Sequence, residues 1–307
     1  MAKLLNETEF AHLEDGRVYR VSRNAWSRSL EPSCFAKIVT WVVLVAVLVY
    51  FLFPIYWLII SSTKTNADLG DSNGLWFAHN AAAENYQKLM GTTNGHFWRW
   101  VANSVLYSTA AGAIGTLVSV MAGYGMAKFK FFGRNVLQLV VMAGLLLPIA
   151  LLTIPLYIVM HSLGLTDTIW SIILPSCVSP FGVFLGRMYA QTSVPDELLE
   201  AARIDGAGES RIFFTMVLRL LAPAMVTIFL FIFVATWNNF LLPLMMVTNN
   251  EQLKPVTLGL YGMMSYFSPT YGAVLQGALF GVLPLMALFL FLQRYWQSGL
   301  AAGSVKG

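Results

Sequence analysis

Six apolar stretches, each longer than twenty residues, alternate with polar connections along this 307-residue chain. They are Ile38–Ile60, Val101–Met126, Val136–Met160, Ile169–Ala190, Leu221–Val247 and Gly272–Gln293. A bilayer core of about 30 Å needs about 20 apolar residues per helix, so each stretch is long enough to cross it. The runs are continuous rather than alternating, which favours helices over barrel strands. With 11% charged residues, against about 25% in soluble domains, the chain is predicted to be an all-α integral membrane protein with six transmembrane helices.

The basic residues predict the orientation, because cytoplasmic connections keep an excess of Lys and Arg. With the N-terminus inside, the predicted cytoplasmic side holds Lys3, Arg17, Arg20, Arg23, Arg28, Lys37, Lys128, Lys130, Arg134, Arg187, Arg203, Arg211, Arg219, Arg294 and Lys306. The outer side keeps Lys64, Lys88, Arg99 and Lys254. The formal net charge of +4 is therefore a topology signal, and no nucleic-acid partner is expected.

The predicted organisation is a cytoplasmic tail over residues 1–37, a six-helix membrane domain over 38–294 and a cytoplasmic tail over 295–307. The first tail lacks the short apolar core of a signal peptide, and we expect it to be retained, with an amphipathic helix. Cys34 and Cys177 are far apart, so neither a disulfide nor a metal site is expected.

The predicted spans contain no acidic residue at their centres. Ion-coupled transporters and pumps usually carry such a group despite its cost of about 2.5 kcal/mol or more. A secondary active transporter is therefore disfavoured, although a sodium site built from carbonyls alone stays open.

Small residues recur every four positions in two of the spans. They are Ala111, Gly115, Ser119 and Gly123 in the second, and Ala273, Gly277 and Gly281 in the sixth. Such a stripe lets another backbone approach closely. Two interpretations stay open, namely packing within the chain and contact with a second membrane subunit.

Prolines and amides interrupt the apolar runs. Prolines such as Pro148 and Pro223 predict bent helices. In the fifth run, Trp237, Asn238 and Asn239 place two amides within hydrocarbon, where an unsatisfied amide costs several kcal/mol. These residues either line a substrate path or make hydrogen bonds between helices.

The outer connection from Thr248 to Tyr271 is rich in aromatic and Met residues. Such side chains form an interfacial belt in membrane proteins, and they also act as anchors for a docking partner. The candidates for docking are Tyr261, Met264, Tyr266 and Phe267.

A cytoplasmic connection over about residues 191–220 has the signals of a short helix. Ser193, Pro195 and Asp196 favour a helix start, and Gly206 favours an ending near Asp205. On such a helix Glu197, Glu200, Ala201 and Ile204 share one face. A second helix is predicted to start near Gly208 or Ser210 and to lead into the fifth span.

The run Glu200-Ala201-Ala202-Arg203-Ile204-Asp205-Gly206-Ala207, followed by Ile212-Phe213, Val217-Leu218 and Pro223, resembles the EAA loop of permease subunits of bacterial ABC importers. The chain is most similar to the MalG-like carbohydrate permeases. Further matches are Asn85-Tyr86, Asn103-Ser104, Trp237-Asn238 with Pro243, and the tail from Gly299 to Gly307. One departure is Arg219, where the family commonly has a proline. Its absence predicts a straighter entry into the fifth span, with Pro223 still able to bend it.

The resemblance implies a type I ABC importer permease fold with a cytoplasmic coupling helix. It implies a bacterial cytoplasmic membrane location with both termini cytoplasmic, a second and related permease subunit, two ATPase subunits and an extracytoplasmic solute-binding protein. The implied ATPase-docking residues are Glu197, Glu200, Ala201, Ala202, Ile204, Asp205, Gly206 and Ala207.

The chain lacks a Gly-x-x-x-x-Gly-Lys-[Ser/Thr] loop, so it is expected to be a transport subunit without its own ATPase, with ATP and Mg held by the partner ATPase subunits. The implied solute is a sugar or oligosaccharide. The alternatives are a permease for glycerol phosphate or another polyol, a secondary active transporter, and a structural membrane protein.

Overall fold

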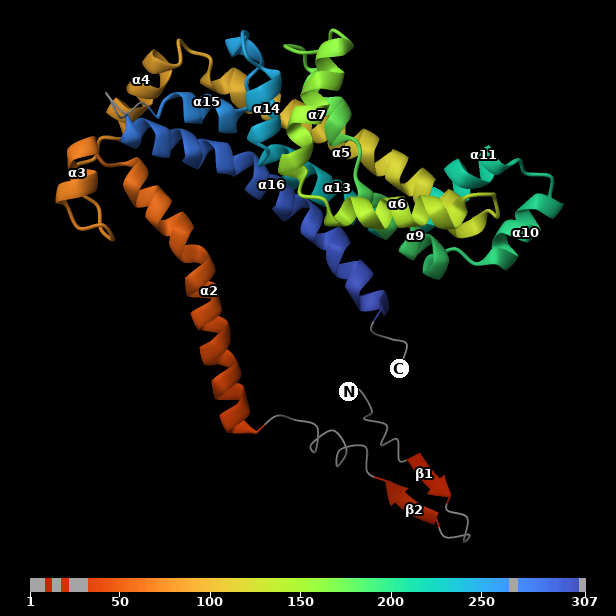
Figure 1. Cartoon of the computed structure of the whole chain (residues 1–307). Coiled ribbons are helices and arrows are strands. Elements are labelled where there is room, and N and C mark those ends of the chain that lie inside the picture. Colours follow the sequence, from red (N-terminus) through yellow and green to blue (C-terminus); the bar gives the residue numbers. More distant parts are fainter. Residues whose placement is uncertain (1–8, 13–17, 22–32, 265–269, 304–307) are drawn as a thin grey trace. The chain divides into compact units, whose positions relative to one another are not determined.

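The computed structural model describes residues 9–12, 18–21, 33–264 and 270–303 (Figure 1). The chain divides into two compact units, Met1–Trp57 and Leu58–Gly307. In the first unit, strands β1 (Glu9–His12) and β2 (Val18–Val21) pair antiparallel, with Phe10 opposite Arg20. The expected amphipathic helix is therefore wrong for these residues, which form a small strand ladder. Apart from this ladder, the regular structure of the described residues is helical.

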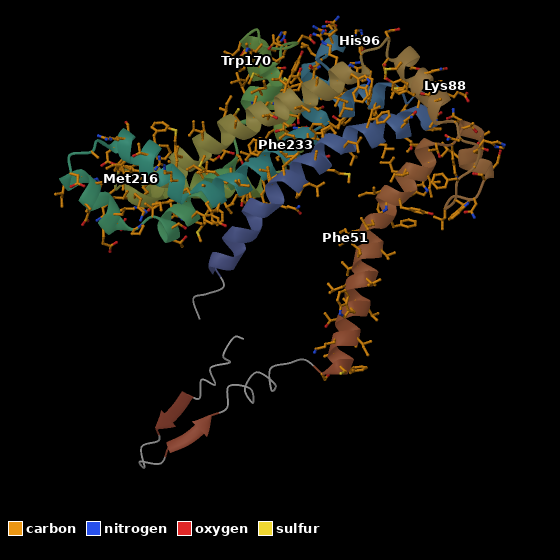
Figure 2. The ribbon with its side chains drawn as sticks, turned by 180° about the vertical axis from the view of Figure 1, so that it is seen from behind. Phe51, Lys88, His96, Trp170, Met216 and Phe233 are labelled. Carbon is orange, nitrogen blue, oxygen red and sulfur yellow. The ribbon has the colours of Figure 1, made fainter. Side chains whose placement is uncertain are left out.

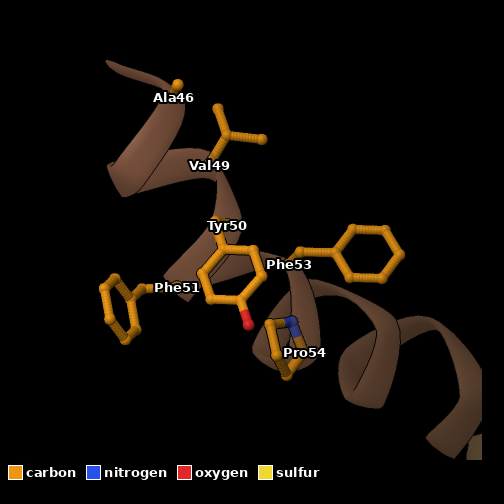
Figure 3. Close-up of a pocket in the computed structure, with 6 residues that line it drawn as sticks. All are labelled: Ala46, Val49, Tyr50, Phe51, Phe53 and Pro54. Carbon is orange, nitrogen blue, oxygen red and sulfur yellow. The ribbon is translucent and has the colours of Figure 1, made fainter. Parts of the chain in front are cut away.

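Helix α2 (Cys34–Ser62) contains the first predicted span and begins four residues before it. From Phe35 to Trp57 most of its large apolar side chains are exposed, as expected of a helix that faces lipid. Figure 3 shows a hollow beside Pro54, lined by Ala46, Val49, Tyr50, Phe51, Phe53 and Pro54. All of these residues belong to α2, so no second element closes the hollow into a binding site.

In the second unit, α5 (Phe97–Lys128) is the central helix and packs against α9 (Pro180–Ser193) and α13 (Ala222–Trp237). A Cβ added to Gly123 would lie 2.4 Å from the backbone nitrogen of Arg187, and one added to Gly186 would lie 3.0 Å from the backbone oxygen of Ser119. The two backbones are therefore in direct contact. The small residues of the second span serve packing within the chain.

The sixth predicted span lies within α16 (Tyr271–Gly303), which packs against α4 (Ala82–Thr92) and α15 (Val256–Gly262). A Cβ on Gly277 would lie 2.6 Å from a methyl carbon of Leu260 and 3.2 Å from one of Leu89. Here too, the small residues are covered by the chain itself.

The six predicted spans are not all single helices. Within the described residues, four helices are long and apolar enough to cross a membrane, over Cys34–Ser62, Phe97–Lys128, Trp170–Ser193 and Tyr271–Gln293. The third of these combines α8 (Trp170–Ser176) with α9. Two bent pairs raise the number to six if each pair is counted as one span.

The first bent pair lies over the predicted span Val136–Met160 and confirms the bend expected at Pro148. Helices α6 (Arg134–Leu146) and α7 (Ile149–Ser162) meet at 110°, with Pro148 at the break. Proline has no amide hydrogen and disfavours helical backbone in the residue before it, which accounts for the bend at Leu147.

The second bent pair leads into the fifth span. Helix α11 (Glu209–Ile212), the π-helix η1 (Phe213–Val217) and α12 (Leu218–Leu220) precede α13, and the chain turns by 80° between α12 and α13. The entry into the fifth span is thus bent even though Arg219 stands where the family commonly has a proline. Pro223, in the first turn of α13, follows directly after the bend.

The remaining short elements are α3 (Asn66–Asp71), α10 (Asp196–Ile204), α14 (Leu241–Met246) and the 3-10 turn η2 (Glu251–Leu253). Figure 1 shows α10 and α11 at one end of the second unit and α4 and α15 at the other. In Figure 2, Met216 marks the first end, Lys88 and His96 the second, and Phe233 of α13 lies between them.

Candidate functional site

Helix α10 is the short polar helix predicted from the capping pattern. It begins at Asp196, with Pro195 at the N-cap. Ser193, expected to cap it, is instead the last residue of α9. Asp196 and Glu197 lie in the first turn, where negative charge is favoured by the helix dipole.

The end of α10 is confirmed in detail. Gly206 has φ +78°, a left-handed backbone that favours glycine. The amide of Ala207 donates to the Ala202 carbonyl at 3.0 Å, and the amide of Gly206 donates to the Arg203 carbonyl at 3.0 Å. This pair of hydrogen bonds is a Schellman ending, so the chain turns sharply after Asp205.

One face of α10 is open and the opposite face is seated in the core. Glu197, Glu200, Ala201 and Ile204 are exposed, and Ile204 keeps 86% of its surface accessible. Leu199 (2% exposed) and Ala202 (7%) are buried with Ile212, Phe213 and Val217. Ala202, grouped with the docking residues from the sequence, therefore packs inward and anchors the helix.

Two ion pairs hold α10. The Lys128 Nζ lies 2.7 Å from Asp196 Oδ1, which joins the end of α5 to the start of α10. The Arg203 Nε lies 2.6 Å from Glu209 Oε1, which joins α10 to α11. The hydrogen bond from Lys128 lowers the pKa of Asp196, and that to Glu209 raises the pKa of Arg203. In the described part of the chain the carboxylates of Glu197, Glu200 and Asp205 form no ion pair, so the open face is acidic.

The amide residues predicted for a substrate path lie at a break in the helix. Trp237 is buried, ends α13 and stacks on Phe233 with ring centroids 5.7 Å apart. The Asn238 Nδ2 donates to the Val234 carbonyl of its own helix at 3.0 Å. The Asn239 Oδ1 accepts from the amide of Leu242 at 3.2 Å and so caps α14. Both amides thus make local hydrogen bonds.

Of the four predicted docking residues on the outer side, two are described. Tyr261 and Met264 are each 55% exposed, and the Tyr261 ring meets that of Phe240 at 4.7 Å. Tyr266 and Phe267 lie outside the described residues.

The N-terminal end of α5 holds the segment Glu251–Val256 by side-chain hydrogen bonds, which the sequence reasoning missed. Four side chains donate to backbone carbonyls: Arg99 Nε to Gln252 (3.1 Å), Trp100 Nε1 to Glu251 (2.8 Å), Asn103 Nδ2 to Gln252 (2.7 Å) and Lys254 (3.0 Å), and Tyr107 OH to Leu253 (2.9 Å). The Ser104 Oγ accepts from the amide of Val256 at 2.9 Å. The available signal was a polar stripe at helical spacing from Arg99 to Tyr107.

Asp167 ties the turn after α7 to the end of α14. Its carboxylate accepts from the amides of Thr248 (2.9 Å) and Asn249 (3.1 Å) and from both of their side chains (3.1 Å each). Partial burial pushes the pKa of Asp167 up, but these four hydrogen bonds outweigh it and lower the pKa below its ordinary value.

Asn85, in α4, links that helix to the end of α2 and to the start of α16. Its buried Nδ2 donates to the carbonyls of Ser62 (3.0 Å) and Lys64 (2.9 Å), while Gly272, at the start of α16, packs against its amide. Among the described residues, no group of three or more His, Cys, Asp or Glu is placed to hold a metal ion.

Residues 115–301 match the model of the family described as binding-protein-dependent transport system inner membrane component. The chain is 35% identical over 258 residues to the arabinooligosaccharides transport system permease protein AraQ of Halalkalibacterium halodurans, covering 83% of this chain and 91% of that protein. It is 32% identical over 255 residues to the lactose transport system permease protein LacG of Rhizobium radiobacter, with coverage of 83% and 91%.

The fold is similar to that of a chain in the crystal structure of a bacterial ABC transporter involved in the import of the acidic polysaccharide alginate. The TM-score is 0.74 at 21% identity, covering 87% of this chain and 99% of that one. The resemblance to ABC importer permeases is confirmed, and the chain belongs to the family of binding-protein-dependent transport system inner membrane components.

Proposed function

We propose that this ABC importer permease subunit carries a sugar or oligosaccharide across the bacterial cytoplasmic membrane and is driven through α10 by a separate ATPase. The distribution of basic residues supports a cytoplasmic position for both termini. The solute class follows the names of the relatives, which are permeases for arabinooligosaccharides and lactose.

The open face of α10 is the observation that carries the coupling role. Ile204 exposes a large apolar side chain on a polar helix, and the neighbouring Glu200 makes no ion pair with any residue that the structure describes. Burying one such apolar side chain contributes about 1.5–3 kcal/mol, and a complementary basic group would fix the register. A groove of a soluble ATPase with an apolar floor and a basic rim fits this face.

The packing and ion pairs of α10 make this helix suited to transmit movement to the rest of the chain. Its inner face is anchored by Leu199 and Ala202, and its ends are held by Lys128 and Glu209. A pull applied to Ile204 is therefore passed to α5 and, through α11 and the 80° bend, to α13. Closure of two ATPase subunits on ATP would thereby move the spans between inward-facing and outward-facing states.

The remaining roles are assigned by position. The exposed Tyr261 of α15 and Met264, which follows the helix, are proposed to contact the extracytoplasmic solute-binding protein. Asn238, exposed at the end of α13, is proposed to line the solute path together with Asn239 and Trp237. A second, related permease subunit would complete that path.

The test uses the full complex of two permease subunits, ATPase and solute-binding protein, with and without candidate sugars. Glu200→Ala and Ile204→Asp should each reduce the amount of ATPase that copurifies by about tenfold or more, and abolish sugar-stimulated ATP hydrolysis. Glu84→Ala on α4 is the matched control, because it removes an exposed carboxylate at the other end of the unit. Normal copurification and stimulation in both α10 variants would reject the coupling role.

A further inference from the structure

Helix α5 reaches from the outer segment Glu251–Val256 to the start of α10. It has 32 residues without interruption, which at 1.5 Å per residue is a length of about 48 Å. Its first three turns hold the outer segment through hydrogen bonds to the main chain. Its last residue, Lys128, pairs with the first residue of α10.

Two glycines of α5 lie in close contact with neighbouring backbone. Gly115 faces the Cys177 carbonyl, and Gly123 faces the backbone of Gly186 and Arg187, with no room for a Cβ. Close-packed interiors shift between discrete arrangements rather than deform continuously. This packing favours movement of α5 and α9 as one unit.

The two side chains of the ion pair between Lys128 and Asp196 differ in their exposure to solvent. The Lys128 side chain is 8% exposed, whereas that of Asp196 is 72% exposed. The Lys128 side chain is covered by its neighbours and so has a restricted position, whereas its hydrogen bond to Asp196 lies at the surface. The ion pair of Lys128 and Asp196 therefore connects α10 to α5. The ion pair of Arg203 and Glu209 connects α10 only to α11, the next helix in the chain.

We propose that the ion pair of Lys128 and Asp196 is the joint through which α5 positions α10, so that α10 follows the outer segment Glu251–Val256 as part of one rigid body. Lys128 belongs to α5, and Asp196 lies one turn before Glu200 at the edge of the open face formed by Glu197, Glu200, Ala201 and Ile204. Because the carboxylate of Asp196 is engaged by Lys128, we assign both residues a positioning role. Through this joint, docking of the solute-binding protein at the outer segment would change the position of α10 and so affect the ATPase bound to it. This inference rests on the proposed coupling role of α10.

The test is Asp196→Asn in the full complex. The expected result is a drop of about fivefold in the ratio of ATP hydrolysis with binding protein and sugar to basal hydrolysis. Copurification of the ATPase should be unchanged, because the docking face is intact. Asp196→Glu keeps the carboxylate and should restore most of the ratio. Glu84→Gln, which breaks the exposed pair with Lys88, is the control and should match the wild type.

Three outcomes would overturn the joint: a wild-type ratio in Asp196→Asn, an equal drop in Asp196→Glu, or a loss of ATPase copurification in Asp196→Asn. The same preparations separate this inference from the proposed function. If Glu200→Ala and Ile204→Asp both retain the ATPase and its stimulation, the coupling role of α10 fails. If Ile204→Asp loses the ATPase while Asp196→Asn behaves as wild type, the joint alone fails.

Discussion

The contact between α5 and α9 predicts a strong difference between two glycines only two residues apart. A Cβ on Gly123 would lie 2.4 Å from the Arg187 nitrogen and 2.6 Å from the Gly186 carbonyl carbon. Both distances are about 1 Å inside the separation at which such atoms attract each other. A Cβ on Gly125 would meet nothing within 4 Å.

The atoms facing Gly123 belong to the backbone of α9, so no side chain can rotate out of the way. Gly123→Ala must therefore move the two helices apart, and overpacking of this kind costs about 1–3 kcal/mol. At about 2–4 °C for each kcal/mol, the melting temperature should fall by about 2–12 °C. Gly125→Ala should leave it unchanged or raise it by about 1–4 °C, since alanine stabilises a helix by about 0.5–1 kcal/mol over glycine.

The measurement is the fraction of monodisperse protein that remains after heating, read by size-exclusion chromatography in detergent. Both variants change one hydrogen to a methyl group on the same helix, so effects of expression and helix propensity are matched. Equal melting temperatures for Gly123→Ala and Gly125→Ala would refute the direct backbone contact, and with it the rigid coupling of α5 to α9.

Three further predictions concern side chains and turns of the second unit. Asn85→Ala leaves two backbone carbonyls without their donor and should destabilise the protein by about 2–4 kcal/mol in thermal melts, whereas the exposed Gln87→Ala on the same helix should be neutral. Gly206→Ala forces a left-handed backbone on a residue with a Cβ, so copurification of the ATPase should weaken, and Gly206→Asn should weaken it less. Because the pKa of Asp167 is lower in the folded protein than in the unfolded chain, its carboxylate stabilises the fold above the unfolded pKa of about 3.9, and this is lost as the pH falls through the folded value. Melting temperatures between pH 3 and 7 should therefore fall on the acid side in the wild type, and Asp167→Asn should flatten that part of the curve.

Local signals predicted local structure well. The acidic first turn at Asp196 and the glycine at position 206 gave a helix with the observed end, because both act on the backbone beside them. The lengths of the apolar runs located the membrane segments, but they did not show which segments are single helices and which are bent pairs. The run containing Pro148 is apolar on both sides of the bend, so its length suggested one span, and the proline was the signal for the break between α6 and α7.

Contacts between distant segments could not be predicted from the sequence. Lys128 and Asp196 are 68 residues apart, and each had several possible partners of opposite charge. Ala202 sits next to Ala201 in the motif, yet the core around Leu199 fixes the rotation of α10 and turns Ala202 inward. The side of a helix that faces the core depends on its neighbours, which one sequence does not define.

The hydrogen bonds from α5 to the segment Glu251–Lys254 have a consequence for how the surface at this end of the second unit can diversify. The four donors bind main-chain carbonyls, which every amino acid carries, and the side chain of Glu251 stays exposed. Substitution of Glu251 or Gln252 would therefore alter the chemistry of this surface and leave its position unchanged. Such a segment suits grafting, because new recognition residues can be introduced on a backbone whose course is set from elsewhere.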